Sequence, residues 1–242
     1  KYMELDPLAQ VEKQKYENSW LIPGAIVFAG LILAITVYEY RLHKNPAPIK
    51  GDVSLMRAVD STDHILGSPS APIKIIEYSD IDSSYSKTFQ ATLEQIMTEY
   101  AAGGKVAWVY RHLPLVDQHP YSAQHAEAAE CAASIGGPTM FWRFINALNI
   151  QAPNSMQFNP KDYGAVVSEL GIVHQSFTEC MNTHKFQKAV ASDFQNGLAT
   201  GAGGSPFTIL VVEGQKPISI NGAVPYASMK KILDDAVRKL EK

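Results

Sequence analysis

Cysteine is scarce in this chain of 242 residues, which contains only Cys131 and Cys180. The two are too far apart in the sequence to form a redox-active pair by their spacing. Basic residues are not in excess either: the net charge is -3 and no lysine/arginine stripe is present, so we expect no nucleic-acid partner. Internal repeats and low-complexity segments are also missing, and 46% hydrophobic with 19% charged residues is typical of a globular protein.

Metal-binding motifs are absent from the sequence as well. His112, His119 and His125 precede Cys131, but their spacings match neither a zinc finger nor an HExxH helix. Pro120 also interrupts this segment. We therefore predict no metal site and no cofactor, and expect these histidines to be solvated or hydrogen-bonded within the fold.

One segment departs from the pattern of a soluble protein. The run WLIPGAIVFAGLILAITVY (Trp20–Tyr38) contains no charged residue and approaches the length that spans a bilayer. A buried core helix would be apolar on one side only, and a signal peptide would have a shorter run and a small-residue cleavage site. We predict a tail over 1–19, a single transmembrane anchor over 20–40 and a linker over 41–52 that includes KNPAPIKGD. Lysines and arginines are nearly balanced on the two sides, so they leave the orientation open.

The remaining residues, 53–242, have the periodicities of an α/β domain. VSLMRAV has a weak strand pattern, APIKIIEYSD from Ala71 has a stronger one, and an amphipathic helix follows from Ser86 to a Gly-Gly stop. With the strand KVAWVYRHLPL they form a β-α-β unit, whose strands should be parallel. Helical patterns fill residues 121–200, and the chain closes with a hairpin and an amphipathic helix. We predict a small mixed sheet covered by helices, with an all-helical insertion at about 121–200.

Several motifs, in this order, resemble those of the DsbA-like thioredoxin-fold family, in particular its membrane-tethered bacterial members. They are DHILGSPSAPIKIIEYSD, KVAWVYRHLPL, HAEAAECA, FTEC, GGSPFTIL and ISINGAVPY, and they begin at Asp63. Each motif alone is weak, and their order and spacing carry the resemblance. It implies an α/β thioredoxin-like fold and a protein of thiol-disulfide oxidoreductase type.

The family's reaction centre corresponds to the stretch DIDSSYSK. There the family has a Cys-x-x-Cys pair at a helix N-terminus, which stabilises the attacking thiolate, and the second thiol resolves the mixed disulfide. This chain has Ser83 and Ser86 at those two positions. Serine forms no S–S bond, and no nearby residue offers a convincing base to activate it, so we expect the exchange site to be inactive. The resemblance also assigns Ser84 and Tyr85, between the two serines, to substrate binding.

Two more parts of the site follow from the resemblance. Glu77 matches a buried acid beneath the first cysteine that assists proton movement, but a strand-end carboxylate satisfied by solvent or a partner fits equally well. Ser205 and Pro206 match a cis-proline loop that lies against the Cys-x-x-Cys site and pairs with an extended substrate strand. An ordinary trans proline that opens a strand is the alternative for Pro206.

The two cysteines match an extra disulfide that some family members have in the helical region. The resemblance therefore implies a bond between Cys131 and Cys180, worth roughly 3–4 kcal/mol in the chain-entropy model. Two buried free thiols that act as small apolar residues are the alternative.

Three hypotheses for the function stay open. The chain is a thiol-disulfide oxidoreductase silenced by two Cys-to-Ser replacements, a natural redox-inactive module that binds extended or unfolded polypeptide, or a structural subunit of a membrane protein complex. In each case we expect a single-pass protein of the bacterial cytoplasmic membrane. Its globular domain should lie on the extracytoplasmic side, where a disulfide is permitted.

Overall fold

The chain divides into a short N-terminal unit, residues 1–48, and a globular unit, residues 49–242. The computed structural model describes residues 27, 29–34, 36, 51–152 and 158–240. All the described residues of the N-terminal unit are helical, and no helix among the described residues combines the length and apolarity needed to cross a membrane. Most of the anchor predicted at 20–40 lies outside the described residues, as do the tail and most of the linker.

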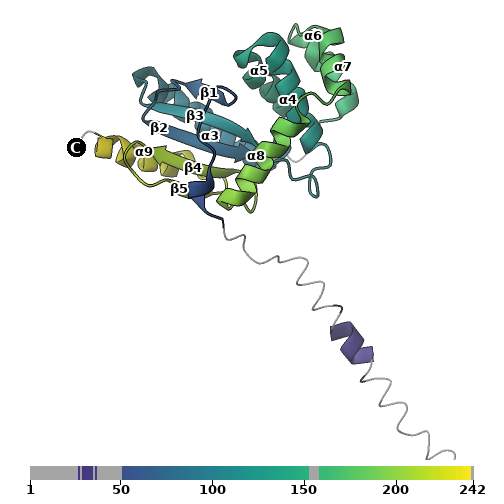
Figure 1. The fold of residues 1–242 in the computed structure, drawn as a ribbon, viewed down its shortest axis with the longest axis horizontal. Coiled ribbons are helices and arrows are strands. Elements are labelled where there is room, and N and C mark those ends of the chain that lie inside the picture. The colour runs from purple at the N-terminus through teal and green to yellow at the C-terminus, as the bar shows by residue number, and fades with distance from the viewer. Residues whose placement is uncertain (1–26, 28, 35, 37–50, 153–157, 241–242) are drawn as a thin grey trace, which may run out of the picture. The chain divides into compact units, whose positions relative to one another are not determined.

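A mixed β-sheet forms the centre of the globular unit (Figure 1). Its strands are β1 (His64–Gly67), β2 (Ile73–Ser79), β3 (Val106–His112), β4 (Phe207–Val212) and β5 (Ile218–Asn221). They lie in the order β1-β3-β2-β4-β5. The pair β2 and β3 is parallel, as predicted for the β-α-β unit, and the other neighbouring pairs are antiparallel. Every residue of β3 is buried because helices cover both faces of the sheet.

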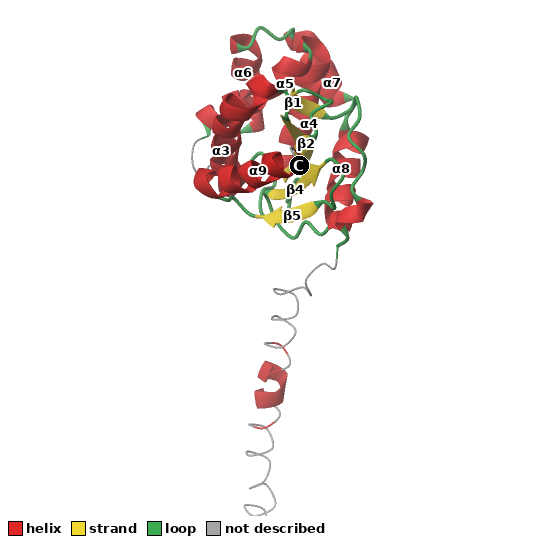
Figure 2. Ribbon diagram, turned by 90° about the vertical axis from the view of Figure 1, so that its left-hand side faces the viewer, coloured by secondary structure: helices red, strands yellow, loops and turns green. Residues whose placement is uncertain are grey.

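Helices and the loops between the elements make up the rest of the described globular unit. The helices are α3 (Ser84–Tyr100), α4 (Ser122–Gly136), α5 (Pro138–Gln151), α6 (Tyr163–Glu169), α7 (His174–Asn182), α8 (Gln187–Thr200) and α9 (Tyr226–Leu240), with 3-10 turns η1 (Val53–Leu55), η2 (Ala101–Gly103) and η3 (Pro160–Asp162). Figure 2 shows α3 and α9 on one side of the sheet and α8 on the other. Phe89 of α3 and Leu233 of α9 belong to the core on the first face, and Phe194 of α8 packs on the second. Helices α4 to α7 form a lobe at one end of the sheet (Figure 1), which agrees with the predicted helical insertion.

A disulfide bond cross-links this lobe. Cys131 of α4 and Cys180 of α7 are joined, with their Cα atoms 5.9 Å apart, which confirms the pairing that the resemblance implied. Both side chains are buried, and 49 residues separate them in the sequence. The bond therefore closes a long loop within the unfolded chain.

The first strand lies later in the chain than the sequence pattern predicts. The segment VSLMRAV does not form a strand: it begins with η1, which Asp52 caps by accepting a hydrogen bond from the backbone N–H of Ser54 at 2.8 Å. Its apolar side chains Val53, Met56 and Val59 instead pack on the second face of the sheet. The cap at Asp52 competes with pairing of this segment in a sheet. The position beside β3 is filled by β1 instead.

Removal of the disulfide should destabilise the fold. For the double variant Cys131→Ala/Cys180→Ala we expect the free energy of unfolding to fall by roughly 3–4 kcal/mol, since the unfolded chain regains the entropy of the open loop. Urea unfolding in oxidising buffer measures the difference. A reducing agent should weaken the wild type by a similar amount and leave the variant unchanged; equal stability of the variant and the oxidised wild type would show that the bond is not stabilising.

Candidate functional site

The candidate site begins where β2 ends at Ser79 and a short loop leads into α3. Ser83 is the residue before the helix, and its Oγ accepts a hydrogen bond from the backbone N–H of Ser86 at 3.3 Å. This cap satisfies one of the unpaired N–H groups of the first turn and fixes where the helix starts. Ser83 therefore caps α3 and Ser86 lies on its first turn, and both are 4% exposed.

The loop before β4 lies directly against this helix end. The Ser205-Pro206 peptide bond is cis, as the resemblance implied. Ser86 Oγ lies 2.7 Å from Ser205 Oγ, and Ser83 Oγ donates to the backbone oxygen of Ser205 at 3.3 Å. The backbone N–H of Asp80 also donates to Ser205 Oγ, at 2.7 Å. The structure thus brings the two serines and the cis-proline loop together, although more than a hundred residues separate them in the sequence.

A hollow of 360 Å³ opens beside this contact. It is lined by Tyr85, Gly203, Gly204, Ser205, Pro206, Asn221 and Gly222. The side chain of Tyr85 is 70% exposed. Three of the four residues that the resemblance assigned to substrate binding line the hollow, and Ser84 does not.

Glu77 belongs to β2, two residues before the strand ends at Ser79, and is 1% exposed. Trp108 Nε1 of β3 donates to Glu77 Oε2 at 2.9 Å, while Oε1 has no hydrogen-bond partner among the described residues. Burial, partly offset by hydrogen bonds from Ser79 and Trp108, raises the pKa of Glu77 to about 7. Glu77 is therefore a buried acid with Trp108 as its partner, which excludes a carboxylate satisfied by solvent but not one satisfied by a protein partner.

Two buried aspartates and two histidines complete the site, and the sequence analysis missed the aspartates. Asp80 accepts hydrogen bonds from the backbone N–H groups of Asp82 and Leu115, and its Oδ2 lies 2.9 Å from His119 Nδ1. Both carboxylate oxygens of Asp82 lie 2.9 Å from His125 Nδ1, and both of these side chains are at most 2% exposed. The acids at a strand end in SDIDS are the sequence signal that could have identified them. The histidines are hydrogen-bonded within the fold, one of the two outcomes expected for them.

The carboxylates of Asp80 and Asp82 place negative charge at the N-terminus of α3, close enough to affect the pKa of Lys87. Both aspartates precede α3, where the partial positive charge of the helix N-terminus favours negative groups. Lys87, on the first turn, donates to the backbone oxygen of Ala152 at 2.7 Å. Burial lowers the pKa of Lys87, and the charges of Asp82 and Asp80 act against that shift. Each histidine–aspartate pair offers two ligands, one fewer than a protein metal site commonly uses.

A mixed sheet in which a helix N-terminus abuts a cis-proline loop is the arrangement of a thioredoxin fold. The family described as Thioredoxin matches residues 59–235 of the chain. The chain belongs to this family. At the helix N-terminus this chain has serine at positions 83 and 86.

Solved structures and curated proteins extend this comparison. BdbD from Bacillus subtilis superimposes with a TM-score of 0.66 at 18% identity, covering 78% of this chain and 100% of that one. DsbA2 from Pseudomonas aeruginosa superimposes with a TM-score of 0.59 at 18% identity, covering 74% of this chain and 96% of that one. These likenesses establish the fold.

The curated relatives are much longer proteins. The Na(+)/H(+) antiporter NhaA 3 of Salinispora tropica is 29% identical over 158 residues, which are 65% of this chain and 23% of that protein. The chain spans about a quarter, or less, of the length of the curated relatives that it matches.

The buried acid should make the stability of the fold depend on pH. The pKa of Glu77 rises from 4.5 to about 7 on folding, so its stabilising contribution is complete below pH 4.5 and is lost as the pH rises to about 7. Relative to Glu77→Gln, the wild type should lose about 3 kcal/mol of unfolding free energy over this interval. Urea unfolding of both proteins from pH 4.5 to pH 8 measures the difference.

The glutamine variant keeps an oxygen that can accept from Trp108, and the comparison cancels the titration of every other group. Parallel stability curves for the two proteins would show that Glu77 titrates in the folded state as it does in the unfolded chain.

Proposed function

We propose that this chain is a membrane-anchored, extracytoplasmic DsbA-like protein that performs no thiol-disulfide exchange and binds extended polypeptide at its cis-proline loop. The observation that carries the proposal is the contact of Ser83 and Ser86 with Ser205. The architecture that positions a reactive thiol pair is present, and two hydroxyl groups occupy it.

The absence of exchange follows from the partners of the two hydroxyl groups. Ser83 Oγ has the backbone groups of Ser86 and Ser205 as its hydrogen-bond partners in the described structure, and Ser86 Oγ has the hydroxyl of Ser205. None of these groups is a base that could take a proton from serine, so neither oxygen is activated as a nucleophile. The two cysteines of the chain are joined to each other and buried in the helical lobe.

Cysteine at both positions should restore exchange. With oxidised glutathione supplied to form the disulfide between positions 83 and 86, the double variant Ser83→Cys/Ser86→Cys should pass that disulfide to a reduced dithiol peptide and be reduced in turn. The helix N-terminus stabilises the thiolate that leaves at position 83. The wild type should give only the uncatalysed rate, and we expect the variant to exceed it at least about tenfold, a barrier lowered by about 1.4 kcal/mol. Rates come from mass spectrometry of the peptide.

The single variant Ser83→Cys is the matched control, since it can form a mixed disulfide but has no second thiol to resolve it. A wild-type rate above the uncatalysed one would sink the proposal of redox inactivity. A folded double variant without any gain would show that the scaffold no longer supports the chemistry.

Polypeptide binding is supported by the hollow beside the cis-proline loop. Main-chain groups are the natural partners of an added extended strand, and two of the lining residues, Gly203 and Gly204, leave the backbone uncovered. A Cβ atom at either glycine would meet nothing within 4 Å, so the space in front of them is open. The exposed ring of Tyr85 adds an apolar surface at the rim.

A side chain placed in this hollow should block binding without disturbing the fold. We expect Gly204→Leu to raise the Kd for a reduced, carboxymethylated polypeptide at least about tenfold, or 1.4 kcal/mol, because the leucine occupies the position of the ligand. Fluorescence anisotropy of the labelled polypeptide measures the affinity. Gly103→Leu is the matched control, because a Cβ there also meets nothing within 4 Å and the residue lies outside the hollow. Equal affinities of the two variants would place the binding surface elsewhere.

The membrane location rests on the uncharged run within residues 20–40 and on the disulfide, which an extracytoplasmic compartment permits.

The uncharged run and the disulfide also fit a second candidate function, that of a structural subunit of a membrane assembly. The curated relatives favour it, because each is named as an antiporter and the matched segment is a small part of it. Stoichiometric co-purification with membrane subunits, combined with no affinity for the unfolded polypeptide, would select this second function.

A further inference from the structure

Three side chains outside the candidate site converge on one point. Glu130 of α4 accepts two hydrogen bonds at a single oxygen, Oε1: His64 Nε2 of β1 lies 2.8 Å away and His112 Nε2 of β3 lies 3.1 Å away. One potential metal-ligand atom from each of the three side chains lies within 4.8 Å of the other two. In a tetrahedral zinc site with bonds of 2.0–2.2 Å, neighbouring ligand atoms lie about 3.4 Å apart, so small side-chain adjustments suffice to place an ion between them.

The two imidazole rings are held in this orientation by packing. The ring of Phe141 stacks on His64 at a centroid distance of 3.5 Å and meets His112 edge-on at 5.7 Å. Among the described residues, Glu130 is the only hydrogen-bond partner of the His112 ring, because Nδ1 is buried without one. Both Nε2 atoms are therefore directed at the carboxylate before any ion binds, which reduces the ordering needed for binding.

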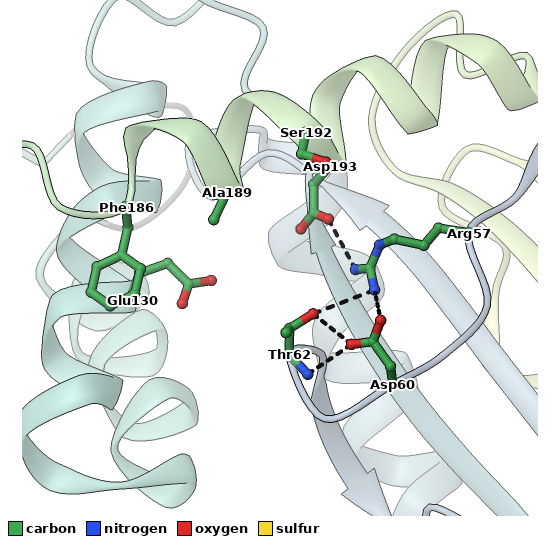
Figure 3. A pocket seen from close by; sticks show the side chains of 8 residues that line it. All are labelled: Arg57, Asp60, Thr62, Glu130, Phe186, Ala189, Ser192 and Asp193. Carbon is green, nitrogen blue, oxygen red and sulfur yellow. Dashed lines mark hydrogen bonds and ion pairs between the residues drawn. The ribbon is translucent and has the colours of Figure 1, made fainter.

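The surroundings favour a cation and leave room for a further ligand. Glu130 lines two hollows, of 410 Å³ and 230 Å³, and His64 lines the second. Figure 3 shows the carboxylate of Glu130 projecting from α4 toward the larger hollow, with Arg57 and its ion-paired aspartates on the opposite side. Three carboxylates, those of Asp60, Glu130 and Asp193, line this hollow against one guanidinium.

We propose that His64, His112 and Glu130 form a site for a divalent transition metal such as Zn²⁺, with a fourth position open toward the hollow. Two imidazoles and a carboxylate are ligands that zinc takes readily, and three protein ligands with one open position is a known zinc arrangement. An oxygen-seeking ion such as Ca²⁺ should bind weakly there, because two of the three ligands are nitrogen.

Zinc titration of the full, tag-free chain in detergent micelles tests the proposal. Isothermal titration calorimetry should show one Zn²⁺ bound per chain, more tightly than Ca²⁺. Both cysteines are in the disulfide, so no thiol competes for the metal. Co²⁺ in place of Zn²⁺ should give the intense visible absorption of a four-coordinate site.

Glu130→Gln and His64→Gln should each raise the Kd for Zn²⁺ about 100-fold or more, since the loss of a ligand exceeds the 10–100-fold effect of losing a second-shell partner. His184→Gln is the matched control: His184 also pairs with a glutamate, Glu127, at 3.3 Å, but it belongs to no group of three ligands in the described structure. Zn²⁺ should raise the melting temperature of the wild type and of the control only.

Three results would overturn the proposal: no stoichiometric Zn²⁺ binding by the wild type, unchanged affinity in both ligand variants, or an equal loss in the control. Circular dichroism establishes that each variant is folded, and either ligand variant alone is sufficient for the comparison.

Discussion

The contact between the first turn of α3 and the Ser205-Pro206 loop holds the candidate site together. Ser205 alone takes part in three of the hydrogen bonds, with the backbone N–H of Asp80, the hydroxyl of Ser83 and the hydroxyl of Ser86. Through them the end of β2 is joined to the start of β4, which pairs with β2 in the sheet. The hollow beside Pro206 has its shape because these segments meet, so any function of this surface depends on their contact.

The buried acids of β2 and of the loop after it cost folding free energy unless they are paired, and the site contains no sulfur. Asp82 is compensated by His125, and Asp80 by backbone N–H groups and His119, so both have the partners that buried charges need. Glu77 is not compensated to the same degree, since one of its oxygens has no partner among the described residues. A buried carboxyl group of this kind weakens the fold when it ionises, and no thiol in the site uses its proton.

Local patterns in the sequence were sufficient for most of the fold, whereas the serines, Glu77 and the cis-proline loop were identified only through the family resemblance. The apolar run that became β2, the spacing of Phe89 and Leu93 in α3 and the glycine stop after it all identify their elements, because burial dictates them. The strand β1 was missed, because whether a segment joins an edge depends on its partner strand and not on its own pattern. Asp80 and Asp82 were missed for a related reason: their partners His119 and His125 come from a distant segment, so only the folded chain shows them to be buried.

Strand β3 explains how the two polar centres of the domain coexist within one core. Successive side chains of a strand point to opposite faces of the sheet, so Trp108 and His112 share one face while Arg111 lies on the other. On the first face, Trp108 binds Glu77 at the candidate site and His112 binds Glu130 at the proposed metal site. Arg111, fully buried on the second face, is neutralised by Asp63 at 2.9 Å. A shift of one residue in the register of β3 would exchange the two faces and leave all three polar side chains buried without partners. The register of β3 against β2 therefore fixes both the hydrogen bond from Trp108 to Glu77 and the position of the His112 imidazole that faces Glu130.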